Sequence, residues 1–431
     1  MTDVTIRSLD DTVTSIRASN LDPHAYVDAC CDRIDERESA VKALLPECNR
    51  CDRLHNDVDE VIDTYSTEDS SLYGVPVGIK DIIHVDGMTT GAGTALPPEL
   101  YQGAEAEIVS RFREAGALFV KTATTEFAGS GPALTRNPND TDHTPGGSSS
   151  GSAAAVAAGM VPLAIGTQTG GSVIRPASYC GIVGFKPSFQ RIPTDGVITR
   201  SQTLDHLGLY TRTLAGMQMT ASIVCDSWDP VETTEKPVLG VPEGPYLDQA
   251  SPEAKKTLEA QIQTLEQAGF TVKSLDVFDD YGNIDTKHHN LSLGELALNF
   301  GDWVDQYRLF FRIKIIERIE QGEQVTAKEL ATARRLPKRL SERNSDIMDE
   351  HEIDFWACPA APSSAPEGIS TTGDSKMNRL WTTAGVPAVT IPAEEINGLP
   401  MGLQCVGEYG RDEKLLADIR PIYDHLIAKD E

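Results

Sequence analysis

The sequence predicts an α/β fold, in which one sheet is covered by helices on both faces. A helical pattern that stops at Gly116 is followed directly by the apolar, strand-like run ALFVK. The same order returns where Ser251 opens a helix that ends near Gly269 and the run FTVKSLDV follows. Helices and strands that alternate in this way are typical of a sheet with helices on both sides.

The first element that we expect is a helix near the start of the chain. Asp22 is placed to cap its N-terminus, and Pro23 fits the first turn, where its missing N–H costs nothing. Three side chains at four-residue spacing then give this helix a buried stripe: Tyr26, Cys30 and Ile34.

A second element, the run YGVPVGIKDIIHV, has the length and the β-branched content of an interior strand, and it contains Lys80. Burial disfavours the charged ammonium form, so we expect the pKa of Lys80 to be lowered. Adjacent side chains on a strand face opposite sides, so Asp81 should point away from Lys80.

The most informative stretch is residues 144–185, which contains two serine clusters framed by glycine. Glycine lets the backbone adopt tight turns and brings backbone N–H groups together, so Ser148 and Ser172 should each be presented in such a turn. We expect a buried helix at 152–158 whose positive N-terminal end points at the first cluster. Neither cluster contains a histidine, which makes the buried Lys80 the candidate base.

These motifs resemble those of the amidase signature family. The resemblance places a triad on Lys80 in GVPVGIKD, on Ser148 in GGSSSGS, where the family has a cis peptide, and on Ser172 in GTQTGGS. The family's spacing of 24 residues between the two serines is kept. Two further segments, 113–130 and 384–407, also resemble the family, so the likeness covers nearly the whole chain.

The resemblance implies a single large domain with a mixed central sheet. It divides the chain into an N-terminal helical arm at 1–64 and an amidase signature domain at 65–431. A variable, substrate-side region is expected at about 280–345.

The implied chemistry is hydrolysis of a carboxamide to a carboxylate and ammonia or an amine. Ser172 would attack the carbonyl carbon while Lys80 withdraws its proton through the Ser148 hydroxyl. The oxyanion would be held by the backbone N–H groups of Thr169, Gly170, Gly171 and Ser172. No metal and no organic cofactor is called for.

An alternative function is that of the acyl-transfer (glutaminase) subunit of a tRNA-dependent amidotransferase. That subunit normally anchors glutamine through an arginine in a recognisable stretch. The comparable stretch here is LFFRIKIIERIEQG, and it does not contain that sequence motif. This difference favours a free-standing amidase.

The sequence differs from the family's usual motif at two positions near Ser172, the expected nucleophile. Gln168 stands where an acid is usual, and Arg175 lies one residue later than the usual arginine. We hypothesise that these two changes together preserve the local balance of charge.

The substrate pocket is predicted from large apolar residues. Four side chains are expected to contact substrate: Phe127, Trp303, Tyr307 and Trp381. Their density suggests an aromatic or aliphatic acyl group, with helix core as the alternative interpretation.

Other catalytic and metal-binding motifs are weaker. The run GSSSG matches the nucleophile elbow with Ser149 as nucleophile, but the stretch before it is typical of a loop rather than a strand. The Cys48–Cys51 pair lacks the second ligand pair that a zinc site needs. The adjacent His288 and His289 are expected in a loop.

Composition excludes several classes of function. With 431 residues, 40% of them hydrophobic, the chain is large enough for an extensive core. The net charge of −27 argues against nucleic acid as a binding partner, and it is also compatible with a salt-rich cell interior.

The expected cellular compartment is the cytoplasm. No run of residues is long and apolar enough to span a bilayer, no signal peptide is evident and the eight cysteines are dispersed. The expected partner is a small-molecule amide, and a homodimer is one expected assembly.

Overall fold

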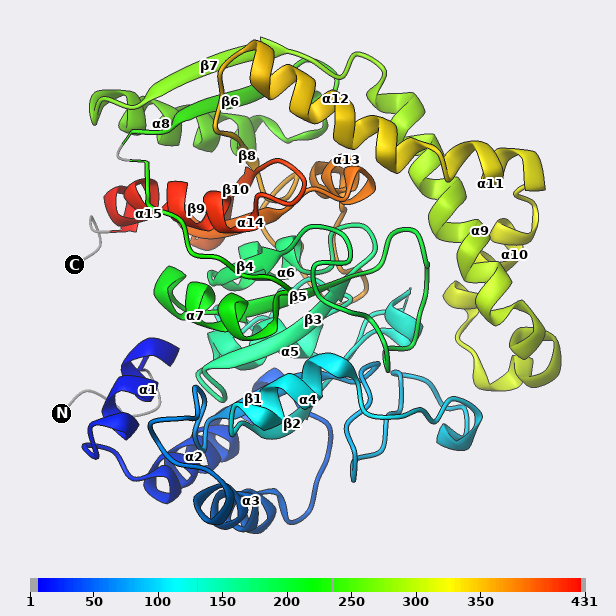
Figure 1. Cartoon of the computed structure of the whole chain (residues 1–431). Coiled ribbons are helices and arrows are strands. Elements are labelled where there is room, and N and C mark those ends of the chain that lie inside the picture. Colours follow the sequence, from blue (N-terminus) through cyan, green and yellow to red (C-terminus); the bar gives the residue numbers. More distant parts are fainter. Residues whose placement is uncertain (1–6, 130, 235, 428–431) are drawn as a thin grey trace.

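The computed structural model describes residues 7–129, 131–234 and 236–427 (Figure 1). Two parts of the sequence-based expectations fall outside these ranges. They are residues 1–6 of the predicted arm and Ser130, at the end of the 113–130 motif.

The described residues form one mixed sheet of ten strands, as expected. The strands are parallel at both ends of the sheet and antiparallel through its middle. In the order in which they lie side by side, they are β2 (Leu118–Thr122), β1 (Pro76–Lys80), β3 (Leu163–Gln168), β5 (His206–Thr211), β4 (Val183–Lys186), β9 (Ala388–Ile396), β10 (Leu399–Val406), β8 (Phe355–Pro359), β6 (Val238–Glu243) and β7 (Thr271–Asp276).

Helices occupy the connections between these strands. The first eight are α1 (Leu9–Arg17), α2 (Pro23–Val41), α3 (Arg50–Thr64), α4 (Glu107–Glu114), α5 (Ser150–Ala157), α6 (Ile174–Cys180), α7 (Leu214–Val224) and α8 (Pro252–Gln267). The others are α9 (Tyr281–Tyr307), α10 (Ile313–Glu323), α11 (Ala327–Ala333), α12 (Leu336–Glu350), α13 (Lys376–Ala384), α14 (Asp412–Asp418) and α15 (Arg420–Ile427).

The sheet is covered on both sides, which confirms the predicted fold class. Helices α5 and α6 pack on one face, and α7, α8 and α15 pack on the other (Figure 1). Apolar side chains of α1, α2 and α3 join the same hydrophobic cluster as those of β1, β2 and β3. The division of the chain at residue 64 stays a prediction.

Several predicted elements lie where the local patterns placed them. The Asp22 carboxylate accepts a hydrogen bond from the Ala25 N–H at 3.1 Å and caps α2. Ser251 caps α8 in the same way, through the Ala254 N–H at 3.2 Å. The strand with Lys80 is shorter than its apolar run, because the chain turns directly after Lys80.

The variable region at 280–345 is helical, which corrects one expectation. His288 and His289 were expected in a loop, but both lie within the 27-residue helix α9. Together with α10, α11 and α12, this helix projects beside the sheet (Figure 1). The long apolar spacing of α9 outweighs the local preference of a histidine doublet for loops.

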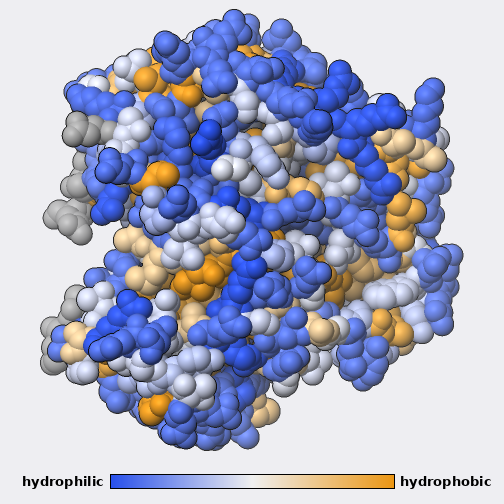
Figure 2. Space-filling model, in the orientation of Figure 1, coloured by the Kyte–Doolittle hydropathy of each residue, from blue (hydrophilic) through white to orange (hydrophobic). Residues whose placement is uncertain are grey.

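The remaining features of the fold are its surface, the hydropathy of its helices and the bonding of its cysteines. Figure 2 shows a predominantly hydrophilic face, in keeping with the acidic composition. Among the described helices, none combines the length and the hydropathy needed to cross a bilayer. Cys31 of α2 and Cys51 of α3 form a disulfide, while Cys48 is free and exposed.

Candidate active site

Lys80 lies at the end of β1 with its side chain fully buried. Its Nζ atom lies within hydrogen-bonding distance of three hydroxyls: Ser148 Oγ at 2.7 Å, Thr167 Oγ1 at 2.7 Å and Ser149 Oγ at 3.0 Å. It forms no ion pair with a carboxylate of the described residues. Burial lowers the pKa of Lys80 well below its usual range, and Asp205 offsets only part of this effect.

The hydroxyl partners allow this amine to be neutral. A neutral amine has two N–H donors and one lone pair, so it needs one hydroxyl that donates to it. Ser149 directs its own proton to the Thr167 carbonyl at 3.2 Å, and it can therefore accept from Lys80. Ser148 has no such competing acceptor for its proton among the described residues, so its hydroxyl can donate to the lone pair of Lys80.

Ser148 stands at the entry to α5. The peptide bond between Gly147 and Ser148 is cis, at the position where the family resemblance implied it. Gly151, in the first turn of α5, lies against the backbone of Ala43 and Ala123, and any side chain there would collide with those atoms. The glycine therefore allows the start of α5, next to Ser148, to approach the end of β2, the strand that pairs with the Lys80 strand.

Ser172 lies between β3 and α6, in the second glycine-framed turn. Its carbonyl accepts a hydrogen bond from the Tyr210 hydroxyl at 2.9 Å, which holds the turn in place. Gln168 Oε1 accepts from the N–H groups of Val173 and Ile174 at the start of α6, at 2.8 and 3.1 Å. The Ser172 hydroxyl itself has no hydrogen-bond partner in the part of the chain that is described, and it faces a cavity.

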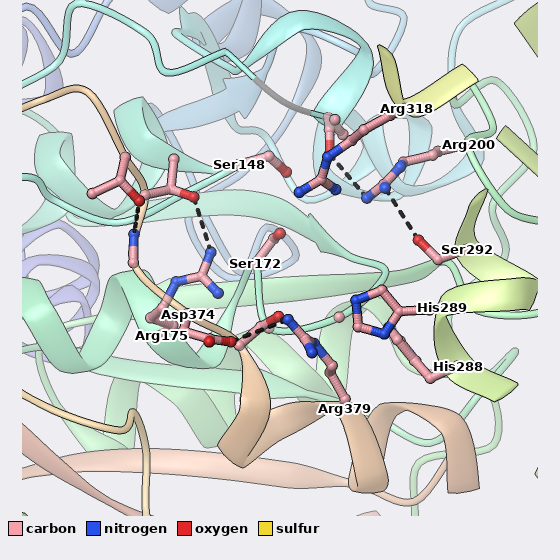
Figure 3. Close-up of a pocket in the computed structure, with 18 of the residues that line it drawn as sticks. Ser148, Ser172, Arg175, Arg200, His288, His289, Ser292, Arg318, Asp374 and Arg379 are labelled. Atoms are coloured by element: carbon pink, nitrogen blue, oxygen red, sulfur yellow. Dashed lines mark hydrogen bonds and ion pairs between the residues drawn. The ribbon is translucent and has the colours of Figure 1, made fainter. Parts of the chain in front are cut away.

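The cavity beside Ser172 has a volume of about 530 Å³ and is polar (Figure 3). Ser148, Gly170, Gly171 and Ser172 line one wall. Around them lie hydroxyls, two histidines and four arginines. The lining residues that matter below are Arg175, Arg200, His288, His289, Ser292, Arg318, Asp374 and Arg379.

Of the four residues whose backbone N–H groups were expected to hold the oxyanion, three line the cavity and one does not. The backbone N–H groups of Gly170, Gly171 and Ser172 donate no hydrogen bond to any described residue, and all three residues line the cavity. Thr169 does not line the cavity, and its hydroxyl donates to the buried Asp205 at 2.6 Å. Gly171 lies so close to the Asn378 side chain that only glycine fits there.

The four side chains that were predicted to contact substrate lie outside the lining of this cavity. Phe127 is buried and packs on Phe300, with ring centres 4.5 Å apart, and on Trp303 at 5.9 Å. Tyr307 lies against the same apolar cluster, and Trp381 belongs to a second cluster, where its indole donates to the Tyr246 hydroxyl at 2.8 Å. None of the four lines the cavity. Their hydrophobic area is used in helix packing, which was the alternative interpretation.

Asp81 points away from Lys80, as the strand geometry predicted. Its carboxylate pairs with Lys121 of β2 at 3.2 Å and accepts from the Gly91 N–H. The negative charge of Asp81 is therefore not available to stabilise an ammonium at Lys80.

Sequence reasoning missed the positive charge of the cavity. Arg175 is buried and donates to the Gly147 carbonyl, next to Ser148. It makes no contact with Gln168, so the charge-balance hypothesis for these two residues stays a prediction. Arg200, Arg318 and Arg379 come from three other segments. Arg318 lies in the stretch LFFRIKIIERIEQG that was compared with the family's glutamine-anchoring stretch, whereas no local motif marks Arg200 or Arg379.

The remaining motifs do not build a site. Ser149 is fully buried, and its hydroxyl is held by Lys80 and the backbone of Thr167. Cys51 of the C-x-x-C pair is bonded to Cys31. Within the described ranges, no cluster of three or more His, Cys, Asp or Glu side chains is arranged to hold a metal ion.

Comparison with known proteins agrees with this geometry. The chain is 29% identical over 430 aligned residues to the A subunit of glutamyl-tRNA(Gln) amidotransferase from Exiguobacterium sibiricum, with 88% of each chain covered. A crystal structure described as an amidase superposes with a TM-score of 0.89 at 28% identity, covering 98% of this chain and all of the other. The peptide amidase of Stenotrophomonas maltophilia shares the fold, with a TM-score of 0.80 at 23% identity, covering 97% of this chain and 96% of that one.

The chain also matches the family as a whole. The model of the Amidase family matches residues 25–416, which include both serine turns, the Lys80 strand and the arginines of the cavity. With that extent of match, a mixed sheet shared with solved amidases and a lysine buried among serine hydroxyls, this chain belongs to the Amidase family.

Proposed function

We propose that the protein hydrolyses a carboxamide through an acyl-enzyme on Ser172. The observation that carries the proposal is the 2.7 Å contact between Lys80 Nζ and Ser148 Oγ, next to a cavity that Ser148 and Ser172 both line. A neutral amine in a buried site can accept a proton, and a chain of hydroxyls can bring that proton from the nucleophile.

In the first half-reaction, Ser172 Oγ attacks the amide carbon. A C–O bond forms, the Ser172 proton passes to the Ser148 oxygen, and the Ser148 proton passes to Lys80. The carbonyl electron pair moves onto oxygen, where the free N–H groups of Gly170, Gly171 and Ser172 can stabilise the charge. One such donor is worth about 3 kcal/mol in other acyl-transfer enzymes.

The same proton chain then runs backwards. As the C–N bond breaks, the proton on Lys80 returns through Ser148 to the leaving nitrogen, and ammonia or an amine departs. Water next attacks the Ser172 ester, loses a proton by the same route, and releases the carboxylate and the free serine. The steps balance without a metal or an organic cofactor.

The test is turnover and trapping with purified protein. Ser172→Ala should abolish ammonia release from a panel of aliphatic, aromatic and amino-acid amides. Hydroxylamine should intercept the acyl-enzyme of the wild type and give a hydroxamate. Ser222→Ala, on the exposed face of α7, is the matched serine control and should keep full activity.

Two results would contradict the mechanism. One is full activity of Ser172→Ala. The other is a Ser149→Ala variant that folds but cannot form the hydroxamate while Ser172→Ala still does, because this would move the nucleophile to Ser149.

A second function is favoured by one specific observation. The relative from Exiguobacterium sibiricum, matched over 88% of both chains, is one component of an amidotransferase. In that case the chain would release ammonia from glutamine and pass it to a partner. The isolated protein would then be nearly inert on simple amides and would gain activity only with its partner proteins, whereas a free-standing amidase turns over alone.

A further inference from the structure

The cavity concentrates positive charge in a protein that is strongly acidic overall. The chain carries 65 acidic against 38 basic residues, yet four arginines and two histidines line this cavity, with Asp374 as the only acid among the lining residues. Such an inversion of charge at one site points to a ligand of the opposite sign.

Asp374 does not neutralise the cluster, because it is already paired. It lies 3.1 Å from Arg379, which also contacts Asp285 at 2.9 Å. Arg379 is thus matched by two carboxylates, and its charge is balanced within the protein.

The guanidinium groups of the other three arginines form no ion pair with a carboxylate in the described structure, although the backbone N–H of Arg200 donates to Asp205 at 2.7 Å. Arg175 donates to the Gly147 carbonyl and, at 3.3 Å, to Thr372. Arg200 donates to the Ala128 carbonyl at 3.3 Å and to Ser292 at 3.1 Å. Arg318 forms no hydrogen bond or ion pair at all within the described residues.

Two of these guanidinium groups also retain unused donors. Arg175 and Arg200 are 4% and 7% exposed, and the buried Nε atom of each has no hydrogen-bond partner among the described residues. Burial lowers the pKa of Arg200 to about 10, with Arg318 as the next cause. A buried guanidinium group without an ion-pair partner lowers the stability of the folded protein. Such groups are therefore typical of sites where a bound ligand supplies the opposite charge.

The arrangement gives the ligand a place relative to the nucleophile. In Figure 3, Arg200 and Arg318 lie on one side of the cavity, and Ser172 lies between them and Arg175. Arg200 comes from the connection between β4 and β5, and Arg318 comes from α10. A planar carboxylate fits the forked N–H groups of such arginines and would leave the amide end of the molecule at Ser172.

We propose that the substrate is an amide that carries a carboxylate and no positive charge, with Arg200 and Arg318 holding the carboxylate. This inference rests on the proposed amide hydrolysis and names its substrate class. An α-ammonium group would meet three unpaired cations, and the one acid in the lining is already taken. The site therefore selects monoamides of dicarboxylic acids over the amides of amino acids.

Three amides with the same five-carbon chain test the proposal. Glutaramate has the carboxylate alone, pentanamide replaces it with a methyl group, and glutamine adds an α-ammonium. We expect kcat/KM for glutaramate to exceed that for each of the others by about 10- to 100-fold, the worth of one or two charge-assisted hydrogen bonds. The pair 4-carbamoylbenzoate and 4-methylbenzamide repeats the comparison at a greater length.

Arg318→Gln is the informative variant, because Arg318 supports no other described residue. It should lower kcat/KM for the carboxylate-bearing amides by about tenfold or more and reduce their advantage over the neutral partners. Arg318→Lys should restore part of that advantage. Lys338→Gln removes the same charge from the exposed face of α12, as the matched control, and should change neither value.

The outcomes separate this inference from the proposed function. Equal rates on glutaramate and pentanamide, or a preference for glutamine or for 4-phosphonobutanamide, would overturn the substrate class while amide hydrolysis stands. If no amide is hydrolysed, calorimetric titration of Ser172→Ala with glutaramate and pentanamide decides the matter. Binding of glutaramate alone, lost in Arg318→Gln, supports the anion site, and equal or absent binding of both overturns it.

Discussion

Two buried lysines on neighbouring strands have opposite electrostatic settings. Lys80 at the end of β1 and Lys121 in β2 are both nearly inaccessible, and their strands pair in parallel, with Ile79 beside Lys121. Lys121 faces Asp81 at 3.2 Å, whereas Lys80 faces three hydroxyls. Burial lowers the pKa of both amines. At Lys121 the effect is partly offset by Asp81, which contacts the amine, whereas at Lys80 the only offset comes from Asp205, which does not contact it.

A third buried lysine shows that a low pKa alone does not make a base. Burial lowers the pKa of Lys186 to about 7, yet its amine contacts only the Pro187 and Val386 carbonyls among the described residues, at 3.0 and 2.6 Å. A carbonyl has no proton to give, and Lys186 does not line the cavity. The proposed mechanism therefore requires both a desolvated amine and a hydroxyl that connects this amine to Ser172, and of the two lysines only Lys80 has both.

The largest expected effect separates the first two lysines by function. Lys80→Met should reduce kcat by roughly 10³- to 10⁴-fold, because it removes the proton acceptor and keeps the side-chain volume. Lys121→Met should leave kcat of the folded protein within about threefold and should instead destabilise it, since Asp81 would be buried without a partner. Steady-state kinetics and urea unfolding of both variants check this. Comparable catalytic losses in the two would end the distinction.

The next test removes the Asp81 carboxylate, which contacts Lys121 and not Lys80. Asp81→Asn should lower the free energy of unfolding at pH 7 by about 3 kcal/mol, because Lys121 keeps its burial and loses its partner. The pKa of Lys121 is then lowered further, so the unfolded chain binds more protons than the folded one up to the ordinary lysine pKa.

It follows that the penalty in Asp81→Asn should shrink as the pH is raised towards 10. Urea unfolding of the wild type and the variant at pH 7 and at pH 10 measures it. A penalty that stays constant over this range would show that Lys121 is not the group left unpaired.

The pH dependence of turnover addresses Lys80 itself. The reactive form is the neutral amine, so kcat/KM should rise about tenfold per pH unit until it passes the lowered pKa of Lys80, and then level off. The plateau should begin well below the pH at which an exposed lysine loses its proton. A rate that still rises through pH 10 would mean that Lys80 is not desolvated in solution.

The smallest effect concerns the hydroxyls around the amine. Thr167→Val removes the 2.7 Å contact to Lys80 Nζ and keeps the shape of the side chain. We expect kcat to fall by about tenfold or less, because Ser148 and Ser149 still hold the amine, and the pH midpoint to move lower, because a hydroxyl that stabilises the ammonium is lost. Thr220→Val, which breaks the hydrogen bond from a buried threonine hydroxyl to the Gly216 carbonyl within α7, is the control.

Much of this site could be predicted from local sequence patterns. The serine turns depend on glycines beside them, and the setting of Lys80 depends on the apolar run around it, so neighbours in sequence carry the information. The opposite directions of Lys80 and Asp81 were expected from strand alternation, and contacts with Lys121 and the Gly91 N–H hold Asp81 just past the end of the strand. The same holds for the capped helices α2 and α8.

The cavity lining could not be predicted in this way. Arg200, Arg318 and Arg379 lie in three segments that only the fold brings together, and nothing beside Arg200 or Arg379 in sequence marks a site. Phe127 and Trp303 could fill either a pocket or a core, and their choice depends on the partners that α9 supplies. Contacts between segments that are far apart in sequence therefore determine that these aromatic side chains belong to the core, and the composition alone could not show this.

The order of strands in the sheet also has a consequence for synthesis of the protein. Strands β9 and β10, near the end of the chain, lie in the middle of the sheet between β4 and β8. A nascent chain that has not yet released them from the ribosome lacks the centre of its sheet, and it also lacks Arg379 and Asp374 until late in translation. Ser172, although made early, is therefore surrounded by its complete cavity only when elongation is nearly finished.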